Sequence, residues 1–216
     1  MNIDRIIANS KKYIDFEIAY KEDSKFMKFL GAVLFFNKDF HKYITTINNT
    51  IYFPNKNYFI EKPVSSISTL LHELVHVSDK NRLTFPLFAL LYLSPQILFL
   101  FCIPLFFVLP IKFALIALLF LAPLPAIGRA WLEFRAYCMS LYVAHVLSDQ
   151  YNVLVDFQGM KANILKQFTG APYYFMFPFK SVIDRKLNQA FDNCLHNKHP
   201  FEDKIFDTAD LILEKK

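Results

Sequence analysis

The sequence predicts a mainly α-helical fold with a small β-hairpin, interrupted by a two-helix transmembrane hairpin. Three observations favour this class: apolar residues recur at helical spacing, one short stretch is β-branched and aromatic, and residues 85–127 carry a single charge, Lys112. The chain of 216 residues is 54% apolar with a mean hydropathy of +0.26, more than an ordinary globular domain needs. We therefore expect one domain in two parts, 1–84 and 128–216, on either side of a membrane segment at 85–127.

The first part of the chain predicts two helices and a hairpin. Isoleucines recur at near-helical spacing through residues 2–20, which predicts an amphipathic helix, and KFMKFLGAVLFF predicts a second helix over 25–36. The stretch YITTINNTIYFP is β-branched and aromatic with Asn48-Asn49 at its centre. It predicts strands at about 43–47 and 50–53 joined by a tight turn.

Helices account for most of the remaining sequence. The run from Ser66–Thr69 to about Asn81 offers N-cap residues followed by an apolar pattern, which predicts a helix. Another helix is expected over 127–148, and Gly159, Gly170, Pro172 and Pro178 predict a broken region after it. Helices at 179–196 and 203–214 complete the chain.

The apolar block at 85–127 is too long for one membrane span. As a single helix its 43 residues would measure about 65 Å, twice the thickness of a bilayer core. Pro110 divides it into predicted spans at 85–109 and 111–127. Basic residues on both flanks favour a cytoplasmic side for the rest of the protein: Lys80, Arg82, Arg129 and Arg135. The alternative is a hairpin buried inside a globular protein.

Charge and cysteine content exclude several classes of protein. The net charge of +5 is spread along the chain without an Arg-rich run, so we expect no nucleic-acid partner. Cys102, Cys138 and Cys194 form no CxxC pair, which favours a reducing compartment over a disulfide framework. The charged N-terminus lacks the apolar core of a signal peptide. The sequence makes no prediction of oligomeric state.

The stretch STLLHELVHVSD contains the strongest functional pattern. His72 and His76 are four residues apart, so a helix places both imidazoles on one face, where they could bind one zinc ion. Glu73 lies one step round the helix and could hydrogen-bond a water molecule on that metal. The alternative is an ordinary buried helix that carries two histidines.

A catalytic zinc site needs a third protein ligand, and Glu133 is the preferred candidate. It lies in GRAWLEFRAY, an otherwise apolar stretch, where a lone buried carboxylate requires a partner. Arg129, four residues earlier, would be an alternative partner, and solvent exposure is a third possibility. A hairpin between the two helices would bring Glu133 back to His76. The histidines outside the motif are weaker candidates: His41, His145, His196 and His199.

These motifs resemble the gluzincin metallopeptidases, and more closely the integral-membrane branch of HtpX-like proteases and CAAX-prenyl endopeptidases. The resemblance covers HELVH at 72–76, an apolar hairpin after it, and the pattern formed by Arg129, Glu133 and Ala136. Those enzymes place after this alanine an Asp that supports a zinc-bound histidine, whereas this chain has Tyr137. Asp79 is the remaining candidate for that support.

The resemblance implies a zincin-like catalytic domain with one Zn²⁺ and a peptide or protein substrate. Glu73 would act as general base, and Tyr137, one turn from Glu133, is the first candidate for stabilising the oxyanion, with simple packing as the alternative. Residues 50–53 are expected to be an edge strand that pairs with substrate. GAPYYFMFPF at 170–179 would either wall the pocket or form an aromatic belt. The alternative function is a non-enzymatic two-span membrane protein, a scaffold or a holin-like protein.

Overall fold

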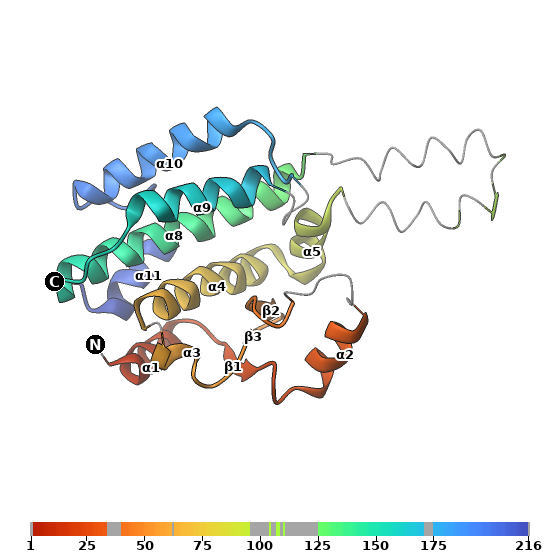
Figure 1. Ribbon diagram of the computed structural model, residues 1–216, viewed down its shortest axis with the longest axis horizontal. Helices are drawn as coiled ribbons and strands as arrows, with labels where there is room; N and C mark the ends of the chain where they lie inside the picture. Colours follow the sequence, from red (N-terminus) through yellow and green to blue (C-terminus); the bar gives the residue numbers. More distant parts are fainter. Residues whose placement is uncertain are drawn as a thin grey trace.

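The computed structural model describes residues 2–33, 40–61, 63–95, 104, 107–108, 110, 125–170 and 175–215. Within them the protein is mainly helical with one three-stranded sheet, so the predicted secondary-structure class is confirmed (Figure 1). The elements are α1 (Ile3–Tyr13), β1 (Glu17–Tyr20), α2 (Lys25–Val33), β2 (Thr45–Ile47), β3 (Thr50–Phe53), α3 (Tyr58–Glu61), α4 (Pro63–Leu83), α5 (Phe85–Leu93), α8 (Ile127–Tyr151), α9 (Phe157–Thr169), α10 (Lys180–Leu195) and α11 (Lys204–Leu213).

Helices α4 and α8 form the centre of the protein and pack side by side in opposite directions (Figure 1). Two contacts show the antiparallel register: Ser68 lies against Ser140, and His76 lies against Glu133, further along α4 and earlier along α8. Both helices bury apolar side chains around most of their circumference, as expected for helices covered on several sides. The buried apolar residues of α4 are Ile67, Leu70, Leu71, Leu74, Val75 and Val77.

The outer elements cover this pair on both sides. Helices α9 and α10 pack against α8, where Leu141, Ile164, Phe168 and Leu187 belong to a second apolar cluster. Helices α1, α3 and α11 and the sheet cover α4 and join the main core. Figure 1 shows both chain ends at the same side of the molecule, because α1 and α11 pack together.

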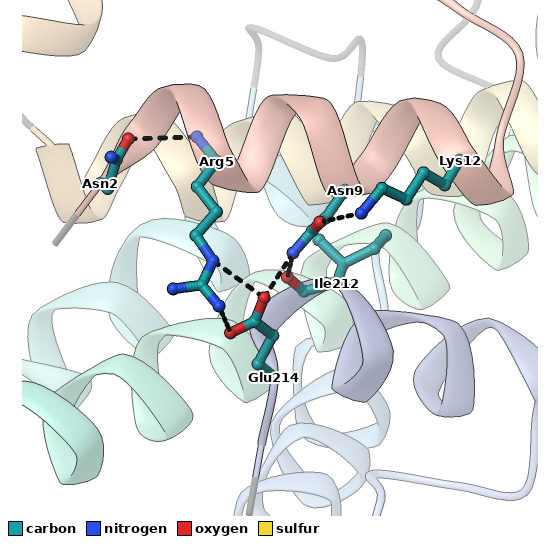
Figure 2. A network of polar contacts seen from close by, with 6 residues as sticks. All are labelled: Asn2, Arg5, Asn9, Lys12, Ile212 and Glu214. Carbon is teal, nitrogen blue, oxygen red and sulfur yellow. Dashed lines mark hydrogen bonds and ion pairs between the residues drawn. The ribbon is translucent and has the colours of Figure 1, made fainter.

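The contact between α1 and α11 is polar at its edge. Arg5 forms an ion pair with Glu214 at 2.5 Å, and Asn9 donates to the carbonyl oxygen of Ile212 and to Glu214 Oε1 (Figure 2). Asn2 caps α1 by accepting from the backbone N–H of Arg5. These hydrogen bonds connect the first and last helices directly.

The sheet has the strand order β1-β3-β2, with β1 parallel to β3 and β2 antiparallel to it. The predicted hairpin is confirmed: Asn48 takes the left-handed conformation with φ 55°, which a two-residue turn requires. The prediction that 50–53 is an edge strand is wrong, because β1 pairs with the outer side of β3. Among the described strands, β2 is the edge that faces α4.

The predicted helix over 2–20 is also corrected. Helix α1 ends at Tyr13, and residues 17–20 form β1. The sequence carries the reason, because the large apolar residues Ile14, Phe16, Ile18 and Tyr20 alternate with Asp15, Glu17 and the small Ala19, which is the period of a strand. Parallel pairing with β3 then satisfies the backbone of this segment.

The other predicted helices occur with small changes of boundary. Helix α8 extends to Tyr151, beyond the predicted end at 148, and α2 is described to Val33, with the rest of the predicted 25–36 helix outside the described residues. Helix α9 was not predicted, because Gly159 suggested a break. Gly159 instead lies in the first turn of α9, where its N–H donates to the Asp156 cap at 2.8 Å.

The predicted transmembrane hairpin is corrected. Among the residues that the structure describes, no helix has both the length and the apolar character needed to cross a membrane. Helix α5 has nine residues, about 14 Å, and ends where Ser94 turns extended before Pro95. Helix α8 is long enough but carries charges within it. The predicted span at 85–109 and the predicted integral-membrane location are therefore wrong. Most of the second predicted span, and Cys102, lie outside the described residues.

Candidate metal centre

The two histidines of HELVH and Glu133 meet in the interior of the protein. One nitrogen of each imidazole and one oxygen of Glu133 all lie within 4.8 Å of one another, a grouping that could hold a metal ion. All three residues are buried, with Glu133 only 1% exposed. The alternative of a solvent-exposed Glu133 is thereby excluded, and the prediction that it joins the two histidines is confirmed.

The two oxygens of Glu133 have different surroundings. Oε1 accepts a hydrogen bond from the Tyr92 hydroxyl at 2.5 Å. Oε2 is buried without a hydrogen-bond partner, and it lies 3.7 Å from His72 Nε2 and 3.8 Å from His76 Nε2. Those distances exceed the length of a hydrogen bond. A buried carboxylate oxygen that faces two imidazole nitrogens without bonding to either is the arrangement that a metal ion would satisfy.

A serine on α8 orients His72. The Ser140 hydroxyl donates to the carbonyl oxygen of Ala136, and it lies 3.1 Å from His72 Nδ1. Ser140 is therefore the acceptor for an N–H at Nδ1, which leaves the lone pair of His72 on Nε2, the atom that faces Glu133. Fixing the tautomer through the second ring nitrogen is a common feature of metal-binding histidines.

Electrostatics favour the ionised form of Glu133 and the neutral form of His76, which are the forms that bind a metal. Burial alone would raise the pKa of Glu133, but His72 and His76 outweigh it and lower the pKa to about 2. Burial lowers the pKa of His76, so its neutral form is favoured. Burial also opposes the charged form of His72, but the neighbouring carboxylates outweigh it and raise the pKa. Metal binding would require His72 to be in its neutral form.

Glu73 lies beside the three residues and is held by the sheet. The Thr46 hydroxyl on β2 donates to Glu73 Oε2 at 2.6 Å. Because β2 is the described edge strand that faces α4, the unpaired side of the sheet and the carboxylate of Glu73 border the same space. This contact was not predicted from the sequence, since nothing local links Thr46 to a residue 27 positions away.

A cavity of about 710 Å³ opens over these residues. Its floor contains His72, Glu73, His76 and Glu133, and one wall is β2 with its turn. Much of the rest is aromatic or aliphatic, with α5 supplying five of the lining residues. The apolar residues that line it are Leu30, Phe40, Tyr43, Ile44, Ile47, Phe85, Phe88, Ala89, Tyr92 and Leu93. A cavity of this size accommodates several residues of a peptide or a small ligand.

Other predicted site residues lie elsewhere. The Tyr137 ring packs on His72 at 4.8 Å between centroids and on Phe168, outside the set that lines the cavity, which favours its packing alternative. Asp79 pairs with Arg135. His145 borders a separate polar groove near the end of α8. Within 170–179, the described residue Met176 is buried in the second apolar cluster.

Besides Thr46, the structure adds two residues that the sequence analysis missed. Tyr92 reaches Glu133 from α5, and Ser140 reaches His72 from α8. Tyr92 fell inside the apolar block assigned to the membrane, so its hydroxyl was read as part of a span. Ser140 lies seven residues after Glu133, two turns along the same helix face, and this spacing was the available signal.

Comparison of the chain with family models, with curated proteins and with solved structures finds no match.

Proposed function

We propose that the protein is a zinc-dependent metalloendopeptidase in which His72, His76 and Glu133 hold one Zn²⁺ and Glu73 is the general base. The observation that carries the proposal is the unpartnered Glu133 Oε2, at 3.7 and 3.8 Å from the two Nε2 atoms. Two ligand atoms on a tetrahedral zinc are roughly 3.4 Å apart, so the two carboxylate–imidazole distances are a few tenths of an ångström too long. The three donor atoms, which lie within 4.8 Å of one another, would move closer together around the ion. Two imidazoles with one carboxylate are a donor set of catalytic zinc sites.

Zinc bound by this set would lower the pKa of a water molecule toward neutrality and polarise a carbonyl group. Glu73 accepts the proton from the attacking water and passes it to the leaving amine. Thr46 fixes the orientation of Glu73 by bonding to Oε2, which leaves Oε1 as the acceptor for that proton. The edge of β2 offers backbone groups to an extended peptide, which would then cross the cavity floor beside Glu73.

Metal analysis and proteolysis of matched variants test the proposal. Purified protein should contain one zinc per chain, and His72→Ala should lose it, whereas His145→Ala, which alters a histidine outside the cluster, should retain it. Glu73→Gln should keep the metal and lose activity against a fluorescence-quenched protein substrate. Wild-type protein without bound metal would favour the non-enzymatic alternative, and an active Glu73→Gln variant would refute the role of Glu73.

A further inference from the structure

The hydrogen bond from Tyr92 gives the two oxygens of Glu133 different surroundings. Oε1 is taken by the Tyr92 hydroxyl at 2.5 Å, whereas Oε2 faces the imidazoles and has no hydrogen-bond partner. A carboxylate can bind a metal through one oxygen or through both. The structure therefore already distinguishes the oxygen that faces the two imidazoles from the oxygen that faces Tyr92.

Packing holds the Tyr92 ring in place on several sides. The ring stacks on Phe88 from the preceding turn of α5, with centroids 5.7 Å apart and an interplanar angle of 20°. The guanidinium carbon of Arg129 lies 4.8 Å from its centroid, a cation–π geometry. The edge of His76 lies against it at 5.9 Å. With the ring restricted in this way, the hydroxyl stays close to Oε1 and is not free to follow it toward the metal.

We propose that Tyr92 is a positioning residue that restricts Glu133 to binding the metal through Oε2 alone. The inference rests on the proposed function and concerns the coordination of the same ion. If both oxygens bound, the metal would have four protein ligand atoms, and water or substrate could bind only as a fifth ligand. By holding Oε1, Tyr92 keeps three protein ligand atoms on the metal and one position open. Tyr92 is thus the contribution of α5 to the metal centre, in addition to its place in the cavity wall.

The test compares Tyr92→Phe with Tyr43→Phe in full-length protein loaded with Co²⁺ or Zn²⁺. Both variants remove one hydroxyl from a tyrosine that lines the cavity, but Tyr43 lies beside the β2–β3 hairpin and not on α5. Tyr92→Phe should weaken metal affinity about 10- to 100-fold, the range seen when a group that orients a ligand is removed. The visible bands of its Co²⁺ form should lose intensity as coordination moves from four to five. Tyr43→Phe should match wild type in both measurements.

The outcomes separate this inference from the proposed function. If wild type binds no metal, the proposed function fails. If wild type binds metal but Tyr92→Phe has the same affinity and the same Co²⁺ spectrum, the role of Tyr92 is refuted and the metallopeptidase proposal stands. If Tyr92→Phe does not fold, X-ray absorption of wild-type Zn²⁺ protein decides: one carboxylate oxygen on the metal supports the inference, and two overturn it.

Discussion

Arg135 is predicted to be the most sensitive polar residue outside the metal centre. Its side chain is 5% exposed, and its guanidinium pairs with Asp79 on α4 and, at 2.5 Å, with Asp203, the N-cap of α11. One side chain therefore joins the helix of the two histidines, the helix of Glu133 and the C-terminal helix. We predict that Arg135→Met destabilises the protein and that Asp79→Asn does so by less.

The magnitudes follow from what each substitution leaves behind. Arg135→Met leaves Asp79 buried at 1% exposure without its cation, and breaking a buried pair in this way costs about 3–5 kcal/mol. Asp79→Asn leaves Arg135 paired with Asp203, so only the loss of a hydrogen-bonded charge remains, about 1–3 kcal/mol. Because the two residues interact directly, the double variant should lose less than the sum of the two single losses.

The pH dependence provides an independent check. Burial raises the pKa of Asp79 even in the presence of Arg135, and removing Arg135 raises it further. Between the unfolded pKa of about 3.9 and the raised folded pKa, the folded chain keeps a proton that the unfolded chain loses. The free energy of unfolding therefore falls as pH rises through that window. The loss caused by Arg135→Met should be smaller at pH 5 than at pH 7.

Urea unfolding followed by circular dichroism at both pH values measures these quantities. An unchanged slope with urea concentration is needed before the free energies of unfolding are compared. The reasoning would be refuted if Arg135→Met cost no more than Asp79→Asn at pH 7. It would also be refuted if the loss were equal at pH 5 and pH 7, because the unpaired Asp79 would then not be the cause.

Three further predictions concern the proposed general base, the proposed zinc ion and the chain ends. Thr46→Val removes the hydrogen bond to Glu73, and a hydrogen bond to a charged group contributes about 1.5–3 kcal/mol. Peptidase assays of this variant should therefore show kcat reduced roughly 10- to 100-fold, with the metal content unchanged. Zinc at 100 times its Kd should raise the free energy of unfolding by about 2.7 kcal/mol, and a chelator should reverse the effect. At the chain ends, Asn9→Ala should cost about 1–3 kcal/mol because its hydrogen bond to the Ile212 carbonyl oxygen is buried, whereas Arg5→Ala should cost less because its ion pair with Glu214 is exposed. Equal losses in denaturant unfolding would contradict this difference.

Local patterns in the sequence were sufficient for the elements that depend on local geometry. The spacing of His72 and His76 places both on one face of any helix, and Asn48-Asn49 between β-branched residues specifies a tight hairpin. Glu133 was identified because a lone carboxylate in an apolar stretch needs a partner. The alternation from Ile14 to Tyr20 also indicates the strand β1. The near-helical spacing of the isoleucines continues through the same residues, however, and it favoured a single helix.

The sequence by itself therefore determined the three candidate metal ligands, because helical periodicity and the cost of burying a charge operate within a few residues. Only the tertiary structure decided which groups hold those donors: Tyr92 on Glu133, Ser140 on His72 and Thr46 on Glu73. It also decided that β2 is the strand beside the cavity and that α5 ends after nine residues as a wall of that cavity. These contacts join elements distant in sequence, and they depend on how α4, α5, α8 and the sheet pack, which no local pattern specifies.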